Sequence, residues 1–339
     1  MKTAITNNPI LSFLGITFLI TFSLWFLPVF VEIPRDVDFA LSLLGSCGPL
    51  IAGYVITVIR SGATFRIASK PLFFIIFVAT WIVFLLFLWM RGDATGGQGT
   101  IPTIDQVGVF AYVLFFVVFF ILALNVSNAT NRKLKENYLR SFLFNRQQVK
   151  WYVLAFFIFI ALNLLSYFVG DVAGYVTSDF LIRPKWTWLI GFFATFLFVG
   201  SNEEFGWRGF FQKELQKKYN PLISALIISF FWSLWHLPLY YNGVYTTEGF
   251  MLSLSRFAWT LPLTIVFTWF YNKSNYSILV VVILHAAFNN ASIIAGRSTT
   301  FYLILGVLFA VFCIIDGKMW KKQSYDHLYH DSSPENDVA

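Results

Sequence analysis

Long runs of apolar residues, separated by short polar gaps, dominate this chain. A helix needs roughly 20 mostly apolar residues to span a bilayer, and most of the runs reach about that length. The pattern predicts membrane-spanning helices at residues 9–30, 39–59, 71–90, 107–126, 151–170, 186–202, 221–240, 252–271, 275–294 and 301–316. The sixth run is short and continues directly into a charged segment. The sequence therefore predicts an all-α polytopic membrane protein with about 8–10 transmembrane helices.

Polar segments divide these predicted helices into parts. We expect residues 1–126 to hold the N-terminal transmembrane helices and residues 127–150 to form a basic cytoplasmic loop. Residues 151–316 then form a C-terminal helical core, followed by a polar, disordered tail at 317–339. The loop is expected to be an ordinary connection and not a true domain boundary. The first run is too long for a signal-peptide core, so it is interpreted as a retained transmembrane helix; an uncleaved targeting signal is the alternative.

Basic residues are distributed unevenly between the two sides of the predicted bundle. Of the 24 Lys and Arg residues, 18 lie at the two ends of the chain or in alternate gaps between the runs. Cytoplasmic loops carry such an excess of Lys and Arg, so both termini are predicted to be cytoplasmic. The chain then crosses the membrane an even number of times. The predicted location is a cell membrane, and we expect a bacterial plasma membrane.

The composition supports a membrane protein and argues against a soluble domain or a nucleic-acid-binding protein. Charged residues make up 12% of the chain, whereas a soluble domain carries roughly 25%. A formal net charge of +7 would suit nucleic-acid binding, but the basic residues lie between apolar runs, as membrane topology requires. The expected partner is therefore the lipid bilayer and not nucleic acid. Cys47 and Cys313 each lie inside an apolar run, so no disulfide framework is expected.

Two adjacent carboxylates follow the sixth apolar run without a polar transition. Ionisable residues at membrane depth are costly and are candidates for a functional site. On a helix, Glu204 and Arg208 are neighbours four residues apart, which favours an ion pair. Glu203 then points about 100° away and is free to face a cavity, where it could act as a base. The alternative is that the two acids simply mark the end of a helix.

Two of the four histidines lie in predicted membrane helices of the same half of the chain. His236 sits in an aromatic-rich run, and a lone histidine there could simply bond to another helix. His285 and Asn289 are four residues apart and share a helix face. Each group alone could hold helices together. Together with the two carboxylates, they supply a base for water, an imidazole and neutral donors for an oxyanion, as peptide hydrolysis requires.

In combination, these motifs resemble those of the CPBP family, also called the Abi or CAAX-protease family, which includes the Ras-converting CAAX prenyl endopeptidase. The resemblance covers about residues 186–295, and Gly48-Pro49 of the second run shows a weaker similarity to the family. The order and spacing of the motifs match, and the three motifs together are specific. The residues that carry the resemblance are Glu203, Glu204, Arg208, Trp232, His236, His285 and Asn289.

The resemblance implies catalytic roles. Glu203 would activate the attacking water with assistance from His236, and Glu204 with Arg208 would form a supporting pair. The substrate would be a peptide or protein at the membrane. The eukaryotic relative cleaves behind a prenylated cysteine, whereas prokaryotic relatives can act on secreted peptides or other membrane proteins.

The resemblance also bears on the oxyanion site and on a metal. His285 and Asn289 would bind the oxyanion or orient the water. Trp232 occupies a position where the family often has Phe, so a reshaped pocket wall is expected. Family members are commonly described as metalloproteases, and His236, His285 and Glu203 could ligate Zn²⁺ with an open fourth position. Equally, Glu203 and His236 could activate water without a metal, which is the mechanism that we favour.

Three functions are compatible with this sequence. The first is an intramembrane endopeptidase that cleaves its substrate near the cytoplasmic face. The second is a non-catalytic membrane protein on the same scaffold, such as an immunity or regulatory factor. The third is a transporter that uses the polar cluster as an ion site. The chain shows no internal repeat of the kind on which many transporters are built, so the first function is preferred.

Overall fold

The computed structural model describes residues 2–94, 108–131, 134, 141–174, 187–242, 244–245, 250–294 and 299–322. The N-terminal helices are α1 (Lys2–Asn7), α2 (Pro9–Trp25), α3 (Leu27–Phe30), α4 (Arg35–Ser46), α5 (Gly48–Ser61), α6 (Lys70–Ala94) and α8 (Val109–Ser127). The later helices are α9 (Val149–Val172), α10 (Thr187–Thr195), α11 (Ser201–Gly206), α12 (Lys213–Gln216), α13 (Pro221–Trp235), α14 (Phe250–Lys273), α15 (Ile278–Ile294) and α16 (Thr299–Asp316). Among the described residues there is no β-strand.

The all-α polytopic fold predicted from the sequence is confirmed. Five helical segments among the described residues are long and apolar enough to span a membrane: Pro9–Phe30, Arg35–Ser61, Lys70–Met90, Val109–Thr130 and Arg146–Val172. Three shorter apolar helices follow in the C-terminal part. Cys47 and Cys313 are both buried free cysteines. The tail beyond residue 322 and residues 132–133 and 135–140 of the basic loop lie outside the described residues.

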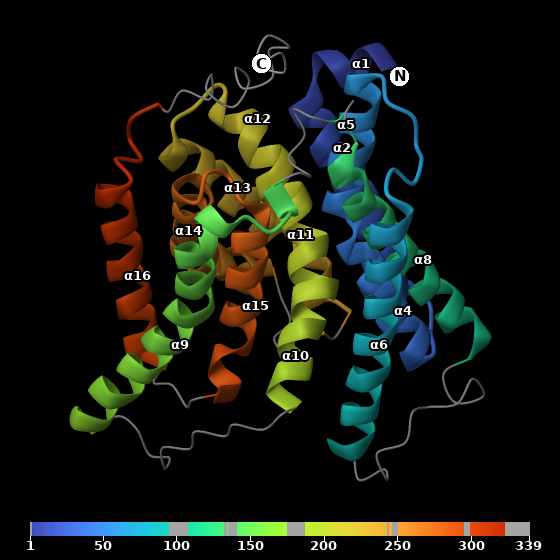
Figure 1. The fold of residues 1–339 in the computed structure, drawn as a ribbon. Helices are drawn as coiled ribbons and strands as arrows, with labels where there is room; N and C mark the ends of the chain where they lie inside the picture. Colours follow the sequence, from blue (N-terminus) through green and yellow to red (C-terminus); the bar gives the residue numbers. More distant parts are fainter. Residues whose placement is uncertain are drawn as a thin grey trace.

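The helices form one bundle with α10, α11 and α12 at its centre (Figure 1). Helices α2, α4, α5, α6 and α8 pack on one side of this central rod, and α9, α13, α14, α15 and α16 pack on the other. Helix α1 and the C-terminal end of α16 lie at the same end of the bundle (Figure 1). A large hydrophobic core runs through both sides, and a smaller cluster joins α10 to α15. The N-terminal helices are therefore part of the structure that holds the central rod.

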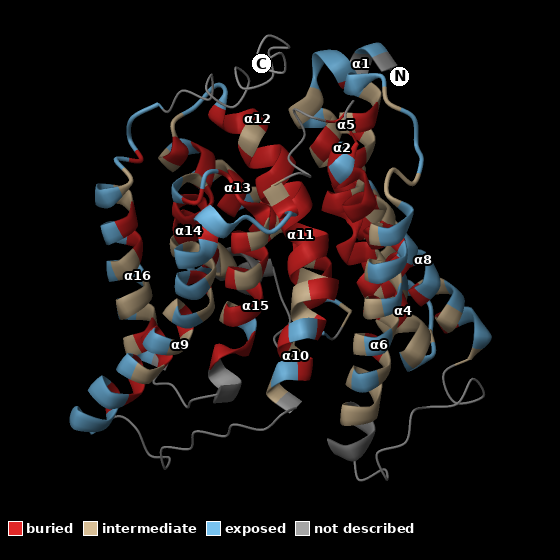
Figure 2. Ribbon diagram, in the orientation of Figure 1, coloured by how far each residue is buried: buried red, intermediate tan, exposed pale blue. Residues whose placement is uncertain are grey.

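Burial is concentrated on α11, on α12 and on the helices that touch them (Figure 2). The outer helices expose large apolar side chains, among them Phe74, Phe116, Phe157, Leu308 and Phe312. Such a surface would be unfavourable in water, but it costs nothing against lipid chains. The phenylalanine-rich composition is thus explained by the surface that the bundle presents to the membrane.

The central rod is longer than the short apolar run that predicted it. The expected span ended at residue 202, whereas helical structure continues without a break from Thr187 to Gln216. Two π-helical segments, Phe196–Gly200 and Trp207–Gln212, flank α11. A π-helical turn adds one residue per turn and often marks a functional site. The charged residues do not end the helix because, as described below, their partners lie inside the bundle.

Gly206 of the central rod lies directly against Pro49 of α5. A Cβ built at Gly206 would overlap the backbone carbonyl and the side chain of Pro49. Only a glycine therefore permits this close approach of the two helices. The contact also explains the Gly48-Pro49 pair of the second apolar run: it forms the surface on which the Glu203–Arg208 segment is seated.

Replacing Gly206 by Ala is expected to reduce both stability and activity. The added methyl group has no space, so α5 and α11 must separate, at a cost of about 1–3 kcal/mol. The measurement is thermal unfolding in detergent. The matched control is Gly15→Ala, because a Cβ at Gly15 would meet no atom within 4 Å. Equal stability of the two variants would show that the contact between Gly206 and Pro49 is not needed.

Candidate active site

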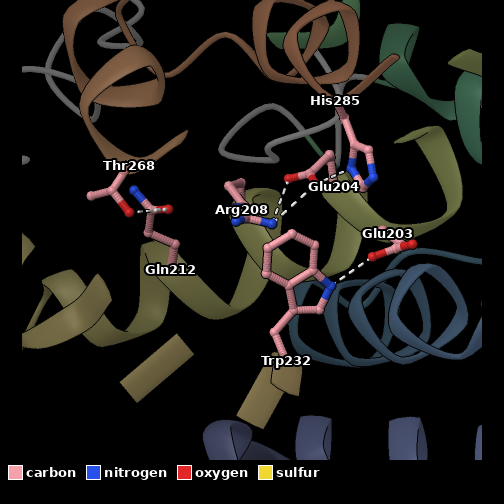
Figure 3. Close-up of polar contacts among 7 residues, drawn as sticks. All are labelled: Glu203, Glu204, Arg208, Gln212, Trp232, Thr268 and His285. Atoms are coloured by element: carbon pink, nitrogen blue, oxygen red, sulfur yellow. Dashed lines mark hydrogen bonds and ion pairs between the residues drawn. The ribbon is translucent and has the colours of Figure 1, made fainter. Parts of the chain in front are cut away.

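Glu204 is held from two sides at the centre of the bundle. Nη1 of Arg208 donates a hydrogen bond of 3.0 Å to its Oε1, as the spacing of four residues predicts. Nδ1 of His285, on α15, lies 2.7 Å from the same oxygen. Because an ionised carboxylate only accepts, Nδ1 of His285 carries the proton of this bond. In Figure 3 these three side chains point toward one another. Glu204 thereby fixes the orientation of the His285 ring.

Arg208 is a fully buried cation. Its side chain and that of Glu204 are both 0% exposed. The guanidinium carbon lies 4.7 Å from the centre of the Trp232 ring and 4.8 Å from the centre of the Phe267 ring. Aromatic faces at this distance attract a cation. The ion pair with Glu204 and these two rings together make the buried charge tolerable.

Glu203 points away from Glu204 and bonds to a tryptophan of α13. Nε1 of Trp232 donates a hydrogen bond of 2.7 Å to Oε2 of Glu203 (Figure 3). Glu203 is 4% exposed and lines a cavity, as its place on the helix predicts. Trp232 was expected only to reshape the pocket wall. Its indole N–H also holds the Glu203 carboxylate, which a Phe at this position could not do.

His236 lies where α13 ends. Its Nδ1 is 2.7 Å from the backbone carbonyl oxygen of Trp232. A carbonyl oxygen only accepts, so Nδ1 donates and the neutral ring keeps a lone pair on Nε2. The helix cannot continue far beyond this point because Pro238 follows. The end of the helix thus fixes both the position and the tautomer of His236.

The predicted site residues gather around one cavity of about 620 Å³. Glu203, Trp232, His236, His285 and Asn289 line it. They come from α11, α13 and α15, which are separated in sequence. Glu204 and Arg208 are absent from its lining and stand behind it. The structure therefore places Glu204 as a positioning residue for His285, and not in contact with the space where a substrate could lie.

The N-terminal helices complete the cavity, which the motifs alone did not predict. Trp25, Ser42, Leu43 and Ser46 form part of the wall. The amide of Asn202 donates a hydrogen bond of 3.1 Å to Oγ of Ser46. The signal in the sequence was Asn202, a buried polar residue directly before the two glutamates, but its partner 156 positions away carries no recognisable motif.

Metal ligation can be tested against this geometry. Among the described residues, no group of three or more His, Cys, Asp or Glu side chains is arranged to hold a metal ion. His236 and His285 each use Nδ1 within the protein, and Glu203 binds Trp232. These bonds leave Nε2 of both histidines available, since a metal-ligating histidine commonly donates its other ring N–H to a carboxylate or a backbone carbonyl. Zn²⁺ ligation by His236, His285 and Glu203 stays an untested prediction.

Comparisons with known proteins agree with the motifs. Residues 185–291 match the family model described as type II CAAX prenyl endopeptidase Rce1-like. The chain is also 28% identical over 275 residues to CAAX prenyl protease 2 of Methanococcus maripaludis, a match that covers 76% of this chain and 97% of that relative. The family match begins just before α10 and ends within α15, so it includes all three motifs.

Proposed function

With the resemblance to the CAAX prenyl endopeptidase family confirmed over residues 185–291, we propose that this multi-pass membrane protein hydrolyses a peptide bond inside its cavity. The observation that carries the proposal is the meeting of Glu203, His236, His285 and Asn289 on one cavity wall. A carboxylate, two imidazoles with fixed tautomers and a neutral amide provide a base, hydrogen-bond acceptors for water and a donor for an oxyanion.

In the proposed reaction, a water molecule lies between Glu203 and His236. Glu203 takes a proton from the water, and the water oxygen attacks the scissile carbonyl carbon. The lone pair on Nε2 of His236 accepts the second hydrogen bond of the water and orients it. The proton held by Glu203 then passes to the leaving amine as the carbon–nitrogen bond breaks. The water is consumed, and the products are a new carboxylate and a new amine.

His285 and Asn289 have different parts in this reaction. Because Nδ1 of His285 donates to Glu204, its Nε2 is the nitrogen left for the cavity, and in the neutral ring it accepts. His285 therefore orients water. The side-chain amide of Asn289 has N–H groups to donate, so it stabilises the developing oxyanion. In this proposal His285 orients the water and Asn289 binds the oxyanion.

The proposed substrate is a membrane-associated peptide with a prenylated cysteine near its C-terminus. The relative from Methanococcus maripaludis is named a CAAX prenyl protease, and the C-a-a-X motif ends a protein chain. The cavity suits an apolar group because many of its wall residues are apolar, among them Leu162, Leu263, Val266, Phe288 and Phe309. The polar groups lie among these apolar residues, so an apolar chain and a peptide could be bound together.

The test is cleavage by the purified wild-type protein in liposomes. A farnesylated peptide that ends in C-a-a-X is expected to be cut, and mass spectrometry of the products gives the bond. The same peptide without the farnesyl group is expected to be cut at least about 10-fold more slowly, because burial of an apolar chain contributes about 0.8 kcal/mol per CH₂ group. Equal rates would remove the prenyl group from the proposal, and absence of cleavage would contradict the peptidase function.

The other two functions receive less support. A non-catalytic immunity or regulatory protein would not need the matched tautomers of His236 and His285 beside Glu203. A transporter is less consistent with the family match. A bacterial plasma membrane with both termini in the cytoplasm is retained as the proposed location.

A further inference from the structure

A second cation lies in the wall of the cavity and has no part in the proposed reaction. Arg256 of α14 lines the cavity together with Tyr245. Its guanidinium carbon lies 4.9 Å from the centre of the Tyr245 ring. Its Nε is buried and makes no hydrogen bond to any described residue. The ion pairs formed by the described residues do not include Arg256.

Arg256 is partly buried and differs from the fully buried Arg208 in its ion pairing, although both carry buried N–H groups without a hydrogen-bond partner among the described residues. Arg208 is matched by the carboxylate of Glu204. A cation in an apolar wall is costly unless an anion or hydrogen-bond acceptors compensate it. Where the described protein provides no carboxylate, the compensating group can come from the substrate. Guanidinium binds a carboxylate with two parallel hydrogen bonds, which makes a carboxylate the best-fitting anion.

The distance from Arg256 to the reacting centre suits a peptide. The rings of Tyr245 and His236 are nearly parallel, with their centres 6.4 Å apart. Arg256 in turn stacks on Tyr245 at 4.9 Å. These two steps separate the guanidinium from His236 by no more than roughly three extended residues, since each residue spans roughly 3.3–3.6 Å. A carboxylate at the end of a short leaving peptide would reach this position.

We propose that Arg256, backed by Tyr245, binds the C-terminal carboxylate of the peptide substrate. This inference rests on the proposed peptidase function. It makes the protein selective for a bond that lies a few residues from a free C-terminus. A peptide that continues far beyond the scissile bond would bring an uncharged backbone to Arg256 and leave the guanidinium without its partner.

The experiment compares two farnesylated C-a-a-X peptides, one with a free C-terminal carboxylate and one with a C-terminal amide. The wild-type protein is expected to favour the acid by about 10- to 100-fold in kcat/KM, because a hydrogen bond to a charged group contributes about 1.5–3 kcal/mol. Arg256→Gln is expected to reduce this ratio to about one, and Arg256→Lys to retain part of it. The control Arg60→Gln, at a distant ion pair with Glu214, is expected to keep the wild-type ratio.

Binding measurements separate this inference from the peptidase function. In Glu203→Gln protein, the acid peptide is expected to bind more tightly than the amide, and Arg256→Gln in that background is expected to abolish the difference. Preference in binding without any cleavage by the wild type would contradict the peptidase but not the carboxylate site. Cleavage of acid and amide at equal rates by the wild type would overturn the inference, as would an unchanged ratio in Arg256→Gln.

Discussion

Replacing Glu203 by Gln is expected to reduce peptide cleavage by about 10²–10⁴-fold, the contribution of a well-placed general base. An amide cannot take a proton from water, so the attacking oxygen is no longer activated. His236 and Asn289 remain in place and leave a low residual rate. The measurement is the single-turnover rate on a farnesylated peptide in liposomes, with protein in excess.

The same substitution is expected to leave the fold intact. The side-chain oxygen of Gln can still accept the hydrogen bond that Nε1 of Trp232 donates to Glu203. The apparent Tm in detergent should therefore stay close to that of the wild type. The matched control is Glu214→Gln, a change of the same kind at a glutamate that pairs with Arg60 and Lys217, outside the cavity. It is expected to keep most of the activity.

Two results would contradict the role of Glu203. Wild-type cleavage rates in Glu203→Gln protein would show that another group activates the water. Loss of activity together with a large loss of stability would show that Glu203 acts through the fold. If the wild type cleaves no peptide and Glu203→Gln protein replaces it fully in cells, the non-catalytic function is favoured instead.

Replacing Arg208 by Leu is expected to lower the free energy of unfolding by about 3–5 kcal/mol, because one partner of a buried ion pair is left without its counter-charge. Glu204, fully buried, would keep only its bond to His285. The favourable contacts of the guanidinium with the rings of Trp232 and Phe267 are also lost. Unfolding in mixed micelles measures the change. The surface-side control Arg60→Leu is expected to cost about 0–1 kcal/mol.

A double substitution distinguishes charge from shape at this pair. Glu204→Gln with Arg208→Leu removes both charges, so stability is expected to recover by at least about 1 kcal/mol relative to Arg208→Leu alone. Activity is not expected to recover, because the carboxylate that fixes the His285 ring is gone. A double variant less stable than Arg208→Leu would show that charge burial is not the cause of the loss.

Much of the fold followed from the sequence alone. The lengths of the apolar runs determined the class, since runs of that length have no stable place in water. The spacing of Glu204 and Arg208 determined their ion pair, because residues four apart meet on a helix. The same periodicity turned Glu203 toward a different face. These features depend on neighbours in sequence, and local geometry is enough to predict them.

Only the tertiary structure decided what stands opposite these residues. Three contacts join helices that are far apart in sequence. They are the hydrogen bond between Glu204 and His285, the hydrogen bond from Trp232 to Glu203 and the close packing of Gly206 against Pro49. The continuation of the central rod through its charged residues depends on these partners as well. The packing of α5, α13 and α15 around α11 sets the distances between these side chains. A local sequence pattern does not determine which helices pack together.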